Sequence, residues 1–502
     1  MSAIAADVRQ PGNLQRWAIL ITVVLATTLY SLAILVVSVL LPQMQGSLSV
    51  TQDEIAWVIT FNILATAVVT PMTGWLTARF GRRRVMIWGT GLFTAATFGC
   101  GASDSLTAVV LFRIVQGACG APLVPLGQAT VLDTFPKSMH GRVTSIFGMG
   151  VVVGPVIGPT LGGYLAELYG WRWAFYMIVP LGALAVLGLI AVLTDKGKDE
   201  SVRLDWTGFL ALSAAVVGLQ LMLSRGQRLD WFESVEITLE LILAAGAFYV
   251  FVVHSLTARA PFLNPRLLLD RNFSIGLLIV FVYGMLNFTP MVLMPPMLQG
   301  LFGFPDSIIG FILGMRGVGA VMGFFAAMFI SRLDVRVGMT LGFLLQAVSG
   351  YLMSGFDTNV TTADVALNSI MQGLAVGIIW VPLTVATFSS LDPRYLAEGS
   401  AIYHLLRNLG SSLYISLSVT LVIVTTQINY AGLAESISEF NKLMSFPAVM
   451  GAWSADGPRA LAHLGGEVGR QAALIGYLNA FEAYMFTCLA VVPLILMVRI
   501  KR

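Results

Sequence analysis

Long apolar stretches separated by short polar segments run through the whole chain. Because a membrane-spanning helix needs about 20 mostly apolar residues, the pattern predicts fourteen spans and an all-α integral membrane fold. The even number of spans places both termini on one side of the membrane. The predicted spans cover residues 17–41, 54–76, 84–103, 105–130, 142–166, 172–194, 207–224, 236–256, 273–298, 306–330, 337–356, 364–388, 397–425 and 477–498.

The distribution of positive charge predicts the orientation of these spans. With the N-terminus in the cytoplasm, the inner segments carry 20 of the 29 Lys and Arg residues and the outer segments carry six. The remaining three, Arg113, Arg316 and Arg407, lie within spans. Since Lys and Arg concentrate on the cytoplasmic side of membrane proteins, both termini are expected to be cytoplasmic.

Composition excludes several classes of protein. Hydrophobic residues make up 57% of the 502 residues and charged residues only 11%, against about 25% charged in soluble domains. No long basic run indicates a nucleic-acid partner, and no G-x-x-x-x-G-K-[ST] motif indicates ATP as energy source. Cys100, Cys119 and Cys488 show no metal-ligand spacing, and we expect neither a disulfide nor a bound metal.

A glycine repeat marks the span over residues 142–166. Gly150, Gly154, Gly158 and Gly162 recur every four residues, which places them on one face of a helix and lets a neighbouring helix approach closely. Gly163 follows directly, and Pro155 and Pro159 interrupt the same helix and can bend it. The stretch is either a packing helix or a moving helix of a transporter.

An internal similarity suggests duplication. Residues 114–126 and 370–383 both contain a Gln-Gly pair, Gln116-Gly117 and Gln372-Gly373, at an offset of 256. We therefore expect a six-span N-terminal bundle (1–200), two inserted spans (201–272) and a six-span C-terminal bundle (273–502) with an outer loop at about 426–476. Halves repeated in this way place a substrate site at their interface.

The inner loop between spans 2 and 3 is rich in arginine. It reads GWLTARFGRRRVMI over residues 74–87. The candidate residues there are Gly74, Arg79, Gly81, Arg82 and Arg83. The cluster either orients the loop or acts as a latch on helix C-termini, where the helix dipole favours positive charge.

Ionisable residues inside spans are the candidates for binding or coupling. Arg113 and Arg407 are costly at that depth unless they face a cavity or a partner. His404 titrates near neutral pH in water, although a lone His in a span is more often a hydrogen-bonded packing residue. Glu482 is the one acid that the sequence places inside a span. No Ser-His-Asp spacing or carboxylate pair indicates an enzyme.

These motifs resemble the major facilitator superfamily, and within it the fourteen-span drug–proton antiporters of the EmrB/QacA type. The loop at 74–84 resembles the superfamily's signature between spans 2 and 3, and Arg113, Gln116 and Gly117 match the span 4 motif. The span 5 antiporter motif is matched by Gly150, Gly154, Pro155, Gly158, Gly162 and Gly163. The resemblance implies the major facilitator fold, with two six-helix halves and two inserted spans.

Three positions depart from the family pattern. The acid expected nine residues before the Leu-Pro pair of span 1 is Ala33, and the acid of the span 2–3 loop is Ala78. The first leaves the proton carrier unidentified, and the second removes an ion pair from the expected latch. Asn62 stands where an aromatic residue is common.

The sequence therefore leads us to expect a proton-coupled exporter of small amphipathic organic compounds in a bacterial inner membrane, with no cofactor besides the proton gradient. The resemblance also implies a periplasmic adaptor and an outer-membrane channel if the source is Gram-negative. A facilitator or exporter of one metabolite, a membrane-embedded enzyme and a non-transporting sensor are the alternatives. The aromatic and Met residues expected to line a cavity are Tyr30, Phe61, Phe147, Phe288, Met291, Met294 and Tyr403.

Overall fold

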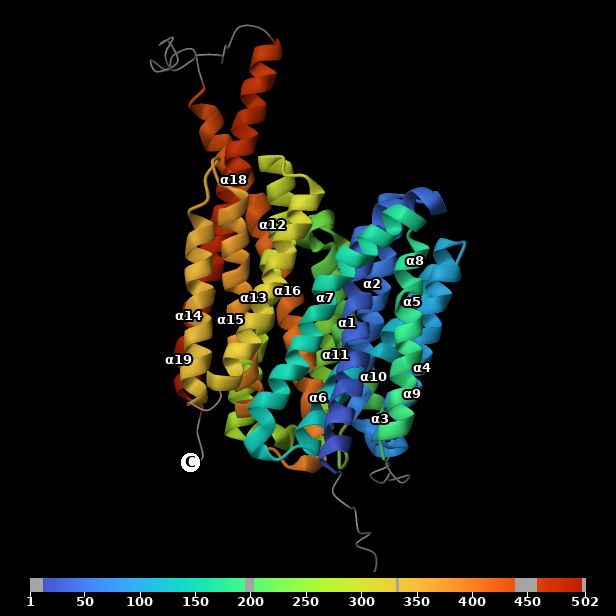
Figure 1. Ribbon diagram of the computed structural model, residues 1–502. Helices are drawn as coiled ribbons and strands as arrows, with labels where there is room; N and C mark the ends of the chain where they lie inside the picture. Colours follow the sequence, from blue (N-terminus) through green and yellow to red (C-terminus); the bar gives the residue numbers. More distant parts are fainter. Residues whose placement is uncertain (1–11, 195–202, 331–333, 438–457, 499–502) are drawn as a thin grey trace, which may run out of the picture.

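The computed structural model describes residues 12–194, 203–330, 334–437 and 458–498, and within these ranges all regular secondary structure is helical (Figure 1). Among the residues described, fourteen segments are long and apolar enough to cross a membrane. They coincide with the fourteen stretches expected from hydropathy, so the all-α membrane fold is confirmed.

The first six spans are built from nine helices, because short breaks divide three of them. Their bounds are α1 (Asn13–Leu48), α2 (Gln52–Val69) with α3 (Thr73–Phe80), α4 (Arg82–Ala102), α5 (Leu106–Gly120) with α6 (Leu123–Thr134), α7 (His140–Tyr169), and α8 (Arg172–Tyr176) with α9 (Ile178–Val192).

The remaining spans follow in the same order along the chain. They are α10 (Trp206–Arg225), α11 (Val235–Thr257), α12 (Arg271–Phe302), α13 (Asp306–Ile330), α14 (Val335–Ser354), α15 (Thr362–Phe388), α16 (Leu396–Glu435), and α18 (Pro458–Ala490) with α19 (Val492–Leu496). We call the end where α6 ends and α16 begins the inner end, because the charge distribution predicts that it is cytoplasmic.

Local sequence signals set where several helices begin. Thr51 and Glu54 form a reciprocal capping box at the start of α2, and Thr361 and Asp364 do the same for α15. Both satisfy backbone N–H groups that a helix start leaves unpaired. Gly81 joins α3 to α4 at φ +85°, a left-handed conformation that favours glycine.

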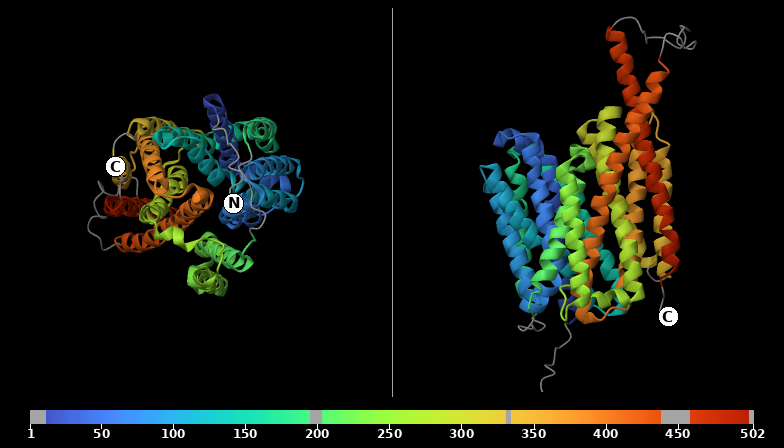
Figure 2. Two further views of the ribbon diagram at one scale, coloured as in Figure 1. Left: turned by 90° about the horizontal axis from the view of Figure 1, so that it is seen from below. Right: turned by 180° about the vertical axis from the view of Figure 1, so that it is seen from behind.

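The inserted spans α10 and α11 pack on each other at the side of the bundle, and α10 also contacts α2 and α16 (Figure 2). Asp205 caps α10, accepts a hydrogen bond from the Phe262 N–H at 3.0 Å and contacts the His254 ring at 2.9 Å. Partial burial raises the pKa of Asp205, but these partners and the Gly208 N–H outweigh it and leave the pKa below its usual value. Asp205 thus ties the two helices to the loop before α12.

Two helices extend beyond the bundle at the outer end (Figure 1). α16 continues to Glu435 and α18 begins at Pro458, so much of the predicted outer loop at 426–476 is helical. The expected helix over 458–475 forms the start of α18, and residues 438–457 of that loop lie outside the described residues. The proposed domain boundaries near residues 200 and 272 stay a prediction.

α7 lies where the N-terminal group of helices (α1 to α9) meets the C-terminal group (α12 to α19). Its glycine face packs on α1, and its other side meets α13, where a Cβ added at Gly148 would lie 2.4 Å from the Phe324 ring. One helix therefore contacts both groups of spans at their interface.

Candidate functional site

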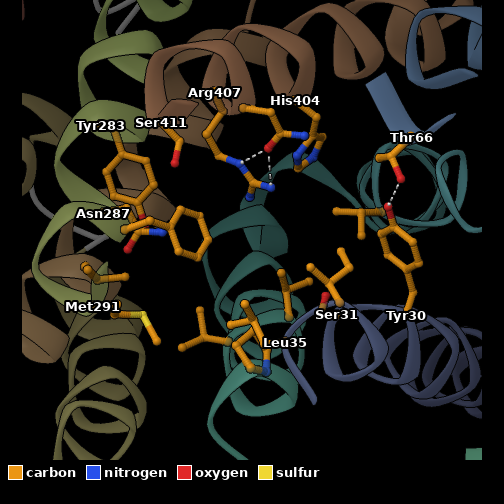
Figure 3. Close-up of a pocket in the computed structure, with 18 of the residues that line it drawn as sticks. Tyr30, Ser31, Leu35, Thr66, Tyr283, Asn287, Met291, His404, Arg407 and Ser411 are labelled. Atoms are coloured by element: carbon orange, nitrogen blue, oxygen red, sulfur yellow. Dashed lines mark hydrogen bonds between the residues drawn. The ribbon is translucent and has the colours of Figure 1, made fainter. Parts of the chain in front are cut away.

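A cavity of about 400 Å³ lies in the middle of the bundle (Figure 3). Residues of α1, α2, α6 and α7 line one side, and residues of α12, α13, α15 and α16 line the other. The site therefore lies where the internal duplication predicts a substrate site, between helices from the two ends of the chain.

Most of the cavity wall is apolar, with a few polar side chains among the aliphatic and aromatic ones. Among the described residues that line it there is no Asp or Glu. The polar lining side chains are Tyr30, Ser31, Asn62, Thr66, Thr70, Gln220, Tyr283, Asn287, Trp380, Arg316, His404, Arg407, Asn408, Ser411 and Ser412. A wall of this kind suits an amphipathic small molecule.

The expected aromatic and Met lining is confirmed in part. Tyr30, Phe288 and Met291 line the cavity. The other four, Phe61, Phe147, Met294 and Tyr403, are not among the lining residues, and the last three belong to the packed core. All seven are apolar positions on spans, and the sequence does not show which face of each span points inward.

Two arginines from different helices reach the cavity without a carboxylate partner. Arg316 of α13 is 8% exposed and donates to the backbone carbonyl and the side-chain oxygen of Asn287. Arg407 of α16 donates to Asn408 Oδ1 at 3.2 Å and lies over the Trp380 ring at 5.4 Å. In the described part of the chain, neither guanidinium forms an ion pair.

His404 links the two groups of helices below the cavity. Its Nε2 lies 2.5 Å from Oε1 of Gln128 on α6, while its Nδ1 is buried and has no hydrogen-bond partner. Gln128 also donates to Thr384 on α15 and accepts from Ser400 on α16. Since these contacts lie toward the inner end, they separate the cavity from that side.

Further contacts join the two groups at the inner end. Lys137, just after α6, donates to the carbonyl of Ser389 at 3.3 Å. Along α13, a Cβ added at Gly317 would lie 2.5 Å from Val156 of α7, whereas one at Gly314, nearer the outer end, would meet nothing within 4 Å. The close packing of α7 on α13 therefore begins at Gly317 and continues inward.

Arg113 lies behind the cavity wall, only 1% exposed. It donates to the carbonyls of Val58 at 3.1 Å and Ala33 at 3.2 Å, and to Gln116 Oε1 at 2.5 Å. Two of the three departures from the family pattern meet here, since Ala33 offers its carbonyl and Asn62 donates to the Arg113 carbonyl at 2.8 Å. Backbone carbonyls thus solvate the buried charge in place of a carboxylate.

The expected interior position of Glu482 is wrong. Its side chain is exposed, on the side of α18 that faces away from the other helices, while its neighbours Phe481 and Tyr484 are buried. Tyr484 packs at Gly350, about one turn from the outer end of α14, so Glu482 lies near the outer end and away from the cavity. Hydropathy gave its approximate depth but not the face of the helix.

The glycine repeat on α7 forms a close contact with α1. Added Cβ atoms would lie 2.5 Å from the Thr28 carbonyl at Gly154 and 2.9 Å from the Leu32 carbonyl at Gly158. At Gly150 and Gly162 they would lie 2.4 Å and 2.2 Å from side chains of α1. Gly163 has more space, because the nearest atom to an added Cβ, in the Val39 side chain of α1, is 4.0 Å away, and Pro155 lines the cavity.

The arginines of the span 2–3 loop bind inner helix ends of the N-terminal group. Arg82 pairs with Asp133 of α6 at 2.8 Å, and Arg83 donates to the carbonyl of Ile190 near the end of α9 at 3.1 Å. Arg79 lies in the last turn of α3, and Gly74 packs against Glu398 of α16.

Gly117 lets α5 approach the Asn62 backbone, where a Cβ added at Gly117 would lie 2.5 Å from the Asn62 carbonyl oxygen.

Comparisons with known proteins agree with this architecture. Residues 23–415 match the family model of the Major Facilitator Superfamily. The chain is 33% identical to the multidrug export protein EmrB of Escherichia coli K12 over 420 residues, which is 83% of this chain and 82% of that protein. It is 32% identical to EmrB of Haemophilus influenzae over 457 residues, 90% of this chain and 89% of that protein.

The fold comparison gives the same result at low sequence identity. The structure of the proton:xylose symporter XylE bound to 6-bromo-6-deoxy-D-glucose superposes with a TM-score of 0.62 at 12% identity, covering 96% of this chain and 95% of that chain. From its fourteen spans, its central cavity between two groups of helices and these matches, the chain belongs to the Major Facilitator Superfamily.

Proposed function

We propose that this chain is a multidrug efflux transporter, which exports small amphipathic compounds by alternating access and uses the proton gradient as its energy source. The observation that supports it most is the cavity between the two groups of helices, which contacts such as Gln128–His404 separate from the inner end. Similarity to the EmrB multidrug export proteins supports export of drug-like molecules over a carrier for a single metabolite.

In this proposal the structure represents a state closed toward the cytoplasm. Opening toward the cytoplasm would break the Gln128–His404 and Lys137–Ser389 contacts and separate α7 from α13 below Gly317. The two groups of helices would then rock about the cavity, which is how repeated halves alternate access in transporters of this architecture. The proposed location is a bacterial inner membrane, with an adaptor and an outer-membrane channel as partners in a Gram-negative envelope.

For the proton carrier we propose His404. No carboxylate is found among the described residues that line the cavity, and His404 is the lining side chain whose ordinary pKa lies near neutrality. Its Nδ1 is free to accept a proton, and its Nε2 already contacts the other group of helices through Gln128. Protonation would therefore act directly on a contact that must break during transport.

The experiment that tests export measures accumulation of a fluorescent amphipathic dye in inside-out vesicles. We expect accumulation when a proton gradient is imposed and its loss when an uncoupler is added. Substrate crossing at the same rate without the gradient would instead indicate a facilitator, and no movement of any of a panel of dyes and drugs would reject the export function.

Coupling is tested by substrate-induced proton release from reconstituted vesicles. We expect His404→Gln to lose proton release, because glutamine keeps hydrogen bonding but does not titrate. Glu482→Gln is the matched control and should behave like the unmodified protein, since the Glu482 side chain is exposed and does not line the cavity. Full proton release by His404→Gln would exclude this residue as the carrier.

A further inference from the structure

The charge of the cavity is its least expected feature. Two guanidinium groups, Arg316 and Arg407, line it, and none of the described lining residues is an Asp or Glu. Arginine stays protonated at neutral pH, so with His404 neutral the wall carries two formal positive charges and no compensating negative charge.

Neither guanidinium is satisfied by its own surroundings. Arg316 is 8% exposed, its Nε is buried without a hydrogen-bond partner, and the groups that it does reach are the neutral oxygens of Asn287. Arg407 has one neutral acceptor, Asn408 Oδ1, and the face of Trp380. A buried charge without a counter-charge is costly, and such a residue inside a span marks a binding function.

The two groups come from different helices, α13 and α16, and both are linked to residues of α12. Tyr283 of α12 packs at 5.6 Å on the Trp380 ring over which Arg407 lies, and Asn287, one turn farther along α12, accepts from Arg316. Figure 3 shows Tyr283, Asn287 and Met291 on one side of the cavity and Tyr30, Ser31 and Leu35 on the other, with the Arg407 side chain between them. The positive end of the cavity is therefore continuous with an apolar wall.

From this arrangement we propose that the preferred cargo is an amphipathic anion, such as a carboxylate with an apolar tail. Its head group binds Arg316 and Arg407 through charge-assisted hydrogen bonds. Its tail lies against the apolar wall formed by residues such as Leu35, Val152 and Met291. This inference rests on the proposed export function and specifies its substrate class.

The wall also explains why an anion is favoured over a cation with the same tail. A cationic head would enter a site with two like charges and no carboxylate to bind it, whereas an anion neutralises one of them. Arg113 adds a third positive charge behind the cavity wall, where it is 1% exposed and reaches the carbonyls of Ala33 and Val58. Discrimination therefore comes from repulsion of the wrong head group as well as attraction of the right one.

The test compares three ligands with one tail and different heads: dodecanoate, dodecylamine and dodecanol. The purified full-length chain in lipid nanodiscs is loaded with labelled dodecanoate at about pH 8, where the carboxylate is ionised and the amine is charged. We expect unlabelled dodecanoate to displace the label at a concentration about tenfold below that of dodecanol, and dodecylamine to be the weakest competitor. Equal competition by all three, or stronger competition by dodecylamine, would overturn the proposal.

Variants then assign the preference to the two arginines. Arg316→Gln and Arg407→Gln should each weaken dodecanoate binding by about tenfold and leave dodecanol binding unchanged, which also shows that the variant is folded. Arg407→Lys should retain part of the preference because it keeps the charge. Arg172→Gln, which removes an arginine paired with Asp104 at the outer end, is the matched control and should bind like the unmodified protein.

Failure of the substrate class can be told apart from failure of export. If vesicles export dyes but the double variant Arg316→Gln, Arg407→Gln binds dodecanoate as well as the unmodified protein, export stands and the anion site is rejected. If dodecanoate binds selectively and no compound is moved by the proton gradient, the anion site stands and export is rejected.

Discussion

Arg113 shows how this chain accommodates a buried charge where its family pattern would supply an acid. The guanidinium reaches the carbonyls of Ala33 and Val58 and the side chain of Gln116, which in turn donates to Thr97 at 2.7 Å. Three spans are tied together by one side chain. Its role in the structure is therefore first to hold α1, α2 and α5 at fixed separation behind the cavity.

This account predicts a stability cost for removing Arg113. Arg113→Met should remove the hydrogen bonds to the carbonyls of Ala33 and Val58 and leave Gln116 Oε1 buried without a donor, at a cost of about 1–3 kcal/mol. The thermal midpoint of the purified protein in detergent should fall accordingly. Arg172→Gln, which loses an exposed ion pair worth about 0–1 kcal/mol, should change it little, and an unchanged midpoint for Arg113→Met would contradict the structural role.

Residue identity alone predicted some residues of this site and missed others. Arg113, Arg407 and His404 could be chosen from the sequence, because a charged or polar residue inside a span is costly unless it faces a cavity or a partner. Glu482 met the same criterion and was wrong, because its depth along the chain says nothing of the face on which it lies. Gln128 and Asn287 were missed, although an amide inside an apolar span is a weaker signal of the same kind.

At the scale of elements, α7 is the helix on which the two groups of spans meet. Its periodic glycines predicted one bare face, and that face packs on α1 with backbone atoms of the two helices nearly in contact. The sequence could not predict the second contact, with α13, because Gly148, Val156 and Gly317 show no shared period. Helix faces follow from periodicity within a span, whereas partners between distant spans follow only from the folded chain.

The glycine contact predicts an unequal response to one added methyl group. Gly154→Ala should push α7 away from α1, because its Cβ would lie 2.5 Å from the Thr28 carbonyl. We expect the free energy of unfolding to fall by about 1–3 kcal/mol and export to be lost. Gly163→Ala is the matched control, since its Cβ has 4.0 Å of space. Vesicle accumulation and thermal midpoint are measured for both, and normal export by a folded Gly154→Ala protein would show that the close contact is not needed.

At the scale of the whole molecule, the claim is that two groups of helices rock about a central cavity and that this structure is closed at its inner end. The fourteen spans were predictable, because hydropathy reports on each segment independently. Which end is closed could not be predicted, since it depends on side chains such as Lys137 and Gln128 meeting residues about 250 positions away.

The most direct measurement of this claim is transport by a protein whose inner end is locked. Lys137→Cys and Ser389→Cys are introduced after Cys100, Cys119 and Cys488 are replaced by alanine, and the pair is cross-linked in inside-out vesicles. Both positions are exposed and the Lys137 amine lies 3.3 Å from the Ser389 carbonyl. The control pair, Asp104→Cys with Arg172→Cys, joins two residues of the N-terminal group whose Arg172 Nη2 and Asp104 Oδ1 atoms lie 2.8 Å apart.

Alternating access predicts that cross-linking residues 137 and 389 stops accumulation and that reduction of the cross-link restores it. The control pair should cross-link without effect, because it joins residues of one group that move together. Full accumulation by vesicles in which residues 137 and 389 are completely cross-linked would contradict the account, since the inner end would then not need to open.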